Sequence, residues 1–186
     1  TGTHNDLTDI AGVTVGQSVD ETARSGVTVM VAERAMTAAV DVRGGGPGTR
    51  ETDALAPGGL VGQVDAIVLA GGSVYGLAAA DGVCAGLGAA GRGFALMETP
   101  GVPRSPIVPA AILYDLANGG DKAWGETPPY RALGLQALKA ASDRPVELGR
   151  AGAGFGAMAG TDPGGTGSAS AMTSDGYTVG ALVCVN

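Results

Sequence analysis

The stretch VDAIVLAGG, residues 64–72, decides the fold. It is a short and almost continuous apolar run that ends at two glycines, which is typical of a strand buried on both faces. The segment that follows, residues 73–91, is rich in alanine and has apolar side chains at Leu77, Val83 and Leu87. This pattern favours a helix, and its glycines at 76, 82 and 86 lower helix propensity but let another backbone come close. A buried strand followed by a closely packed helix indicates a mixed α and β domain.

The same alternation continues in both directions along the chain. Runs of β-branched residues predict four further strands, at 12–17, 26–33, 37–45 and 176–186. Residues 106–120 predict an apolar segment with a helical end, and residues 128–142 predict an amphipathic helix. Residues 150–170 are rich in glycine and predict irregular chain. No linker or change of composition divides the sequence, so we expect a single domain over residues 1–186.

Composition excludes several classes of protein. The chain has 186 residues and 34 glycines, without the three-residue period of collagen. Only 16% of the residues are charged and the mean hydropathy is +0.22, which excludes a disordered chain. No apolar run reaches the roughly 18 residues that a membrane-spanning helix needs.

Charge and cysteine usage bear on partners and compartment. The net charge of −7 disfavours binding to nucleic acid, and the basic residues do not form the cluster that an anionic membrane attracts. Cys84 and Cys184 lie far apart, each in an apolar segment. We expect two buried reduced thiols, with a disulfide or a reactive thiol as the alternatives, and therefore a cytoplasmic protein.

The only histidine, His4, lies in the polar segment TGTHNDLTD at the N-terminus. A catalytic imidazole must be held within hydrogen-bond reach of its nucleophile, so His4 is a poor candidate. Histidine and cysteine do not cluster as a zinc site requires. The pattern G-x-G-x-x-A at residues 152–157 is not followed by the helix that dinucleotide binding requires, and it is interpreted as a turn. The sequence therefore predicts no metal and no cofactor, and any catalytic base is a group other than histidine.

Two polar side chains are candidates for a site. Tyr75 follows the glycine pair at the end of the predicted strand, where its hydroxyl could donate to a developing oxyanion. The alternative is a core aromatic residue with its hydroxyl bonded to backbone. Lys122, in GGDKAWG, could act as a base or stabilise charge in a dry site. The alternative is an exposed lysine that pairs with Asp121.

The last predicted strand runs through ALVCV and stops at Asn186 without a turn, a cap or a polar tail. A buried strand that ends so abruptly leaves its terminal carboxylate to be solvated. Either the chain is truncated, later residues are disordered, or a precursor was cut, and we expect a missing C-terminal partner segment.

Several segments together resemble one known family, in the order in which the family has them. They are VDVRGGGPGTRETD (40–53), AIVLAGGSVYGLAAADGV (66–83), PIVPAAILYDL (106–116), GRAGAGFGA (149–157), GGTGSAS (164–170) and GYTVGALVCVN (176–186). The opening LTDIAGVTVGQ, residues 7–17, is similar to the family's first strand. The resemblance is to the DmpA-type L-aminopeptidase/D-esterase family of N-terminal-nucleophile (Ntn) hydrolases, with the nylon-oligomer hydrolases as a related branch.

This resemblance implies an αββα sandwich similar to that of the Ntn hydrolases but differently connected. It also implies a precursor that cuts itself before a serine or threonine, which then begins a small (β) subunit and is the nucleophile. Its own amine is the base, so no histidine is needed. The present chain then corresponds to the large (α) subunit, its partner is its own β subunit, and αβ units form a closed homo-oligomer.

The resemblance also implies three site residues in this chain. Tyr75 in GGSVYG matches the family's active-site tyrosine, and Lys122 in GDKAWG matches the lysine of the nylon-hydrolase branch. Asn186 in LVCVN matches the asparagine whose amide stabilises the oxyanion. We therefore expect an aminopeptidase or amidase that acts on small peptides or amides. The alternatives are a nylon-oligomer or pantetheine-type amidase and, in another class, a non-catalytic protein that binds a small molecule.

Overall fold

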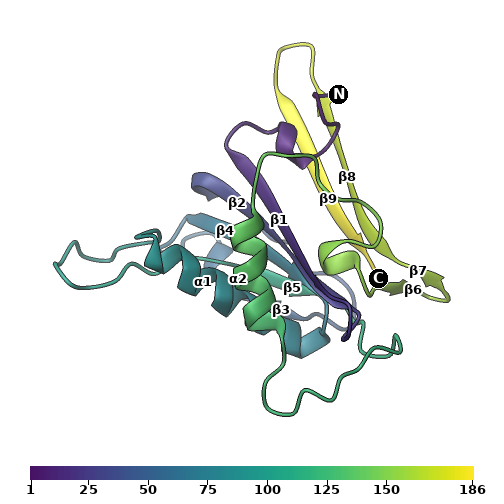
Figure 1. Ribbon diagram of the computed structural model, residues 1–186. Helices are drawn as coiled ribbons and strands as arrows, with labels where there is room; N and C mark the ends of the chain where they lie inside the picture. Colours follow the sequence, from purple (N-terminus) through teal and green to yellow (C-terminus); the bar gives the residue numbers. More distant parts are fainter.

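The computed structural model describes all residues, 1–186, and its centre is a five-stranded mixed sheet (Figure 1). The strands are β1 (Val13–Asp20), β2 (Ser25–Thr37), β4 (Gln63–Ala70), β5 (Ala110–Ile112) and β3 (Thr49–Arg50), in that spatial order. β4 pairs with β2 in antiparallel orientation and with β5 in parallel orientation. The carboxyl ends of β4 and β5 therefore meet at the same edge of the sheet.

Two helices, α1 (Ala79–Ala89) and α2 (Tyr130–Ala140), cover one face of this sheet (Figure 1). A 3₁₀ helix, Ser73–Ala78, leads directly into α1. The core lies between the helices and the sheet, where β2 contributes Val27, Val29 and Val31 and β4 contributes Ala66, Val68 and Ala70. With eleven residues each, neither helix is long enough to cross a membrane.

The two helices touch at their backbones. A Cβ added to Gly82 on α1 would overlap the carbonyl oxygen of Arg131, and one added to Gly134 on α2 would overlap that of Ala79. Gly76 and Gly86 are also closely covered, by the carbonyl oxygen of Gly71 and by leucine side chains of α2. The close approach of another backbone that was expected at Gly76, Gly82 and Gly86 is confirmed for Gly76 and Gly82, whereas Gly86 is covered by side chains.

A second, two-stranded sheet lies against the other face. Its strands are β8 (Gly165–Met172) and β9 (Thr178–Val185). Met30, Ile67 and Leu69, which alternate with the core residues along β2 and β4, face Ala181 and Leu182 of β9 across a cavity of about 370 Å³. The layers are helices, sheet and sheet, so the predicted mixed α and β class is confirmed and three layers of the expected sandwich are present.

The remaining elements are short. They are β6 (Met158–Ala159), β7 (Asp162–Pro163) and the 3₁₀ helices Leu7–Asp9, Thr52–Leu55 and Gly152–Gly154.

Three local predictions are wrong. Residues 38–48 have no regular structure, because β2 ends at Thr37 and the glycine-rich segment beyond it finds no strand to pair with. Residues 106–120 contain β5 and no helix, since the segment pairs with β4 instead. Within the segment expected to be irregular, residues 165–172 form β8, whose small residues give no β-branched pattern and which pairs with β9 throughout its length.

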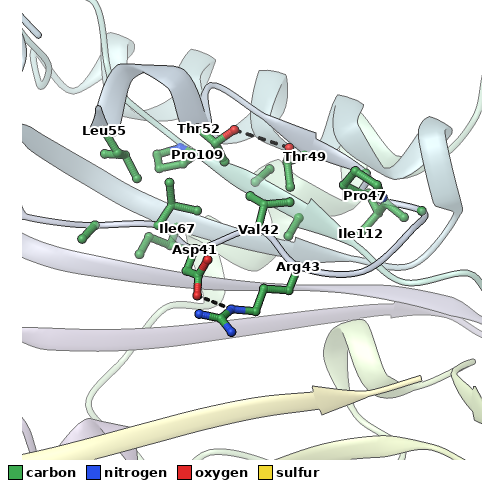
Figure 2. A pocket seen from close by; sticks show the side chains of 16 residues that line it. Asp41, Val42, Arg43, Pro47, Thr49, Thr52, Leu55, Ile67, Pro109 and Ile112 are labelled. Carbon is green, nitrogen blue, oxygen red and sulfur yellow. Dashed lines mark hydrogen bonds and ion pairs between the residues drawn. The ribbon is translucent and has the colours of Figure 1, made fainter. Parts of the chain in front are cut away.

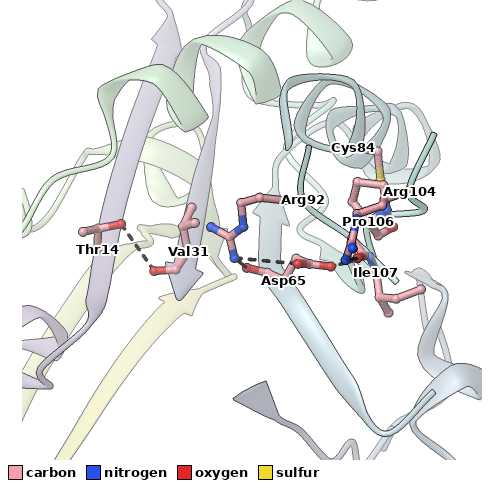
Figure 3. A network of polar contacts seen from close by, with 9 residues as sticks. Thr14, Val31, Asp65, Cys84, Arg92, Arg104, Pro106 and Ile107 are labelled. Carbon is pink, nitrogen blue, oxygen red and sulfur yellow. Dashed lines mark hydrogen bonds and ion pairs between the residues drawn. The ribbon is translucent and has the colours of Figure 1, made fainter. Parts of the chain in front are cut away.

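A polar network fixes the start of β4 against the approach to β5 (Figure 3). The buried carboxylate of Asp65 accepts a hydrogen bond from the backbone N–H of Ile107 at 3.0 Å. Arg92, just beyond α1, donates to the carbonyl oxygen of Asp65 at 3.4 Å and lies 3.7 Å from its carboxylate. This network holds the entry to β5 beside β4 and so helps to set their parallel pairing.

The contact between α1 and α2 can be tested with two glycines of one helix. Gly82→Ala should destabilise the protein by about 2 kcal/mol or more, because the added methyl group meets backbone that cannot move aside. Gly88→Ala is the control: its Cβ would meet nothing closer than Pro106 at 3.7 Å, so it should stabilise by about 0.5–1 kcal/mol through helix propensity. Urea denaturation measures both free energies of unfolding, and equal effects would contradict the proposed packing.

Candidate functional site

The candidate site begins at the sharp turn that ends β4. Gly72 and Ser73 both adopt positive φ angles, of 85° and 52°. A side chain on Gly71 would overlap the carboxylate of Asp115, and one on Gly72 would overlap the ring of Tyr130. The turn therefore needs both glycines, and it directs the chain into the 3₁₀ helix that carries Tyr75.

Asp115 follows β5 just as this turn follows β4, so the parallel pairing places the two side by side. Its side chain is only 1% exposed. One carboxylate oxygen accepts from the hydroxyl of Ser25 at 2.6 Å, and the other accepts from the backbone N–H of Gly72 at 2.7 Å. Burial raises the pKa of Asp115, and the two hydrogen bonds oppose that shift.

Lys122 is half-buried and does not pair with Asp121. Its ammonium donates to the carbonyl oxygen of Ala23 and, at 2.9 Å, to the side-chain oxygen of Asn118. Asp121 instead accepts from the backbone N–H of Ala123. Burial lowers the pKa of Lys122, while the charge of Asp115 acts in the opposite direction. The alternative of an exposed Asp121–Lys122 pair is therefore wrong.

The ring of Tyr75 contacts an aromatic side chain of the loop that carries Lys122. Trp124 lies edge-on to Tyr75, with ring centroids 5.6 Å apart, and edge-on to Tyr130 at 5.8 Å. Tyr75 is 46% exposed, whereas Tyr130 is buried and its hydroxyl has no hydrogen-bond partner. Burial raises the pKa of Tyr130 to about 12, and the nearby Ser25 hydroxyl opposes this shift although its geometry is not that of a hydrogen bond. The alternative of Tyr75 as a core aromatic residue is wrong, because almost half of its surface is accessible.

Asn186 is exposed and follows directly on β9. Two residues earlier, Cys184 packs on the small cluster of Leu113, Ala153 and Ala157. Since Leu113 lies at the end of β5, β9 ends at the same edge of the molecule as β4 and β5. No hydrogen bond joins Asn186 to Tyr75 or Lys122, so their convergence on one reacting centre stays a prediction.

Sequence patterns missed three polar residues of this site, the buried Ser25 and Asp115 and the partly buried Asn118. Asn118 donates to the carbonyl oxygens of Arg24 and Gly156, at 2.6 and 3.0 Å, where a helix end was expected. One feature of the sequence could have indicated Asp115. It follows an apolar run, just as the glycine pair follows the apolar run before it. That signal becomes informative only when the two strands are known to be parallel.

A separate hollow of about 370 Å³ lies at the β3–β5 edge of the main sheet (Figure 2). Val42, Leu55, Ile67 and Ile112 are among its apolar lining residues, and an ion pair of Asp41 with Arg43 lies beside it. Tyr75, Lys122 and Asn186 are not among the residues that line it.

The other potentially reactive side chains are the single histidine and the two cysteines. His4 contacts Thr8, with 3.1 Å between its Nδ1 and the hydroxyl oxygen. Both cysteines are free and partly buried, and burial raises the pKa of each thiol. No three His, Cys, Asp or Glu side chains gather where they could hold a metal ion.

Comparison with known proteins gives consistent matches along the chain. Residues 5–186 match the family described as Peptidase family S58. An uncharacterized aminopeptidase of Mycobacterium leprae is 45% identical over 98% of this chain and 52% of its own length. A 6-aminohexanoate-oligomer endohydrolase of Kocuria sp. is 35% identical over 82% of this chain and 38% of its own.

Solved structures agree with these matches. A β-aminopeptidase from Burkholderia sp. superposes with a TM-score of 0.77 at 26% identity, over 100% of this chain and 53% of its own. The L-aminopeptidase D-Ala-esterase/amidase of Ochrobactrum anthropi, described as a new variant of the Ntn hydrolase fold, gives a TM-score of 0.75 at 23% identity. It covers 98% of this chain and 53% of its own. The chain thus has the fold of these enzymes and spans about half their length.

The hydrogen bond between Ser25 and Asp115 can be tested against a neighbouring hydroxyl that makes none. Ser25→Ala should destabilise the protein by about 1.5–3 kcal/mol, because a buried carboxylate loses a donor. Tyr130→Phe removes a hydroxyl that has no partner, and it should change stability by less than about 1 kcal/mol. Thermal and urea unfolding check both values, and a larger loss for Tyr130→Phe would show that its hydroxyl has a partner.

Proposed function

The chain belongs to peptidase family S58, as its resemblance to the DmpA-type enzymes implied, and from this premise we propose that it is the large-subunit part of an amide-bond hydrolase. Relatives named as aminopeptidases and the Ntn hydrolase fold of its neighbours support this proposal. The nucleophile is the Thr or Ser that begins a separate β subunit. The chain acts together with that subunit as an αβ unit.

The observation that carries the proposal is the environment of Lys122. Its ammonium is half-buried and donates only to neutral oxygen atoms, and none of the ion pairs in the structure includes it. An ammonium group has three N–H donors, so one remains available. A positive charge that is already in place and partly shielded from water is suited to stabilise an oxyanion.

The mechanism assigns each of the three residues a role around the nucleophile. The hydroxyl of the β-subunit Thr or Ser attacks the amide carbonyl, and its own α-amine takes the proton. Asn186 donates its amide N–H to the tetrahedral oxyanion, and Tyr75 adds a hydroxyl donor or holds the carbonyl. Lys122 favours the anionic transition state and helps to keep the terminal amine neutral. As the intermediate collapses, the α-ammonium returns its proton to the amide nitrogen, the C–N bond breaks, the amine leaves and an acyl-enzyme ester remains. Water then attacks this ester and releases the acid and the free nucleophile.

The proposed substrate is the N-terminal residue of a small peptide or amide. A second candidate is an amide oligomer of the nylon type, which is favoured by the 6-aminohexanoate-oligomer endohydrolases among the relatives and by the position of Lys122. The αβ units are proposed to form a closed homo-oligomer. Two free, half-buried thiols support a reducing compartment, the cytoplasm.

The subunit composition gives the first test. The purified full-length protein should contain a second, smaller chain that begins with Thr or Ser, because its freed amine is the proposed base. Intact-mass spectrometry under denaturing conditions and N-terminal sequencing detect it. An active amide hydrolase made of a single uncut chain would contradict the proposal.

The role of Asn186 gives a second test in correctly cleaved enzyme. Asn186→Ala should lower kcat by about 10²–10³, with a much smaller change in KM, because an oxyanion donor is lost. Tyr75→Phe tests its hydroxyl alone, since the ring and its contact with Trp124 remain. Asn5→Ala is a matched control, because Asn5 lies near the N-terminus and bonds Ser170. Full activity of Asn186→Ala would remove Asn186 from the site.

A further inference from the structure

Asp115 is a buried carboxylate that no cation pairs with directly. The four ion pairs of the structure involve other acidic residues. Its two hydrogen-bond donors, the Ser25 hydroxyl and the Gly72 N–H, are neutral. Moving a carboxylate out of water without a paired cation is unfavourable, so the ionised form of Asp115 depends on the hydrogen bonds and charges around it.

The segment that begins at Asp115 lies along the start of β2 and bonds it residue by residue. The carbonyl oxygens of Thr22 and Ala23 accept hydrogen bonds from the backbone N–H of Asp121 and from the ammonium of Lys122. The carbonyl oxygen of Arg24 accepts from the side-chain amide of Asn118. The hydroxyl of Ser25 donates to the carboxylate of Asp115. The position of Lys122 is therefore fixed by the same row of contacts that ends at Asp115.

On its other side Asp115 holds the turn before Tyr75. The carboxylate lies against Gly71 and accepts from the N–H of Gly72. Ser73, the next residue, has a φ of 52°, which is rare for a residue with a side chain and is retained only where surrounding contacts enforce it. The same carboxylate thus fixes the backbone that directs Tyr75.

We propose that Asp115 is a positioning residue, whose ionised carboxylate fixes the turn that carries Tyr75 and supplies the buried negative charge that acts on the Lys122 ammonium. The role of Asp115 in catalysis rests on the proposed function, whereas the effect of its charge on the Lys122 ammonium does not. Asp115 does not touch the substrate, because its side chain is covered by Ser25, Gly71 and Gly72.

The charges around Lys122 support this assignment. They are Asp115, Arg24, Asp20 and Asp121, and among them Asp115 has the largest effect on the pKa of Lys122. Its negative charge favours the ammonium, against the burial that lowers the pKa. Removal of that charge should therefore lower the pKa of Lys122 further and increase the neutral amine at a given pH.

The test compares Asp115→Asn with Asp121→Asn in the full-length protein. Asp121 is an exposed carboxylate near the same lysine, so it is a matched control whose effect water should screen. Lys122 and Lys139 are the two lysines of this chain, and Lys139 is exposed on α2. Pulse acetylation with acetic anhydride at a series of pH values, followed by peptide mapping, gives the titration midpoint of each amine.

We expect Asp115→Asn to move the Lys122 midpoint to lower pH, so that its acetylation relative to Lys139 rises about threefold or more near neutral pH, since one pKa unit changes the neutral fraction about tenfold. Asp121→Asn should change this ratio far less. An unchanged midpoint in folded Asp115→Asn overturns the proposal. If Asp115→Asn does not fold, Ser25→Ala replaces it, because this variant removes a donor that favours the ionised Asp115 carboxylate. Ser25→Ala should move the Lys122 midpoint to lower pH by a smaller amount. An unchanged Lys122 midpoint in Ser25→Ala overturns the proposal equally.

Kinetics then separate positioning from a merely structural role. In the cleaved enzyme Asp115→Asn should lower kcat more than it changes KM, and the alkaline limb of the pH–rate profile should move to lower pH with the Lys122 midpoint. A loss of kcat with an unmoved limb would overturn the electrostatic role. If the wild-type protein hydrolyses no amide, the proposed function fails, and the acetylation midpoints still decide the role of Asp115.

Discussion

The parallel pairing of β4 with β5 is the constraint on which the site depends. It places the glycine pair that follows β4 against the carboxylate of Asp115, which follows β5. The two lie so close that a methyl group on the first glycine would overlap the carboxylate. The carboxylate of Asp115 occupies the space where a side chain of Gly71 would lie, and the ring of Tyr130 occupies that of Gly72. The conformation of the turn is therefore fixed by these neighbouring side chains. The helix that follows then starts in a defined direction, and Tyr75 on its first turn comes to lie against Trp124.

The abundance of glycine follows from the same kind of constraint. Helix α1 meets α2 at Gly82 and Gly134, and a side chain at either position would enter the neighbouring backbone. Each of these glycines weakens its own helix by about 1 kcal/mol relative to alanine, and the close contact must offset that loss. Other glycines have positive φ angles and open space around them, as Gly44 and Gly176 do, so they serve turns rather than packing.

The sequence predicted correctly those elements whose secondary structure is determined by a local pattern of residues. Residues 64–72 and 128–142 formed the expected strand and helix, because a continuous apolar run and a helical periodicity each depend on only a few neighbouring residues. It failed for β8, whose Gly, Ser and Ala residues become a strand only because β9 pairs with them. Asp115 was missed for a related reason: nothing near it in sequence indicates that it will be buried beside Gly72. Tyr75, Lys122 and Asn186 are predicted as site residues through resemblance, and local spacing alone left Tyr75 and Lys122 undecided.

The geometry also bears on where the nucleophile comes from. The one serine hydroxyl that donates to a buried carboxylate at this site belongs to Ser25, a pairing that in another setting would suggest an activated nucleophile. Ser25 is completely buried, and its hydroxyl lies under the turn of Gly71, so no substrate carbonyl can reach it. His4, bonded to Thr8 near the N-terminus, offers no base at this site. What this chain does provide there is a half-buried ammonium and an accessible tyrosine, groups that stabilise charge rather than attack. Such an arrangement fits the proposed mechanism, in which the nucleophile and its base belong to the β subunit.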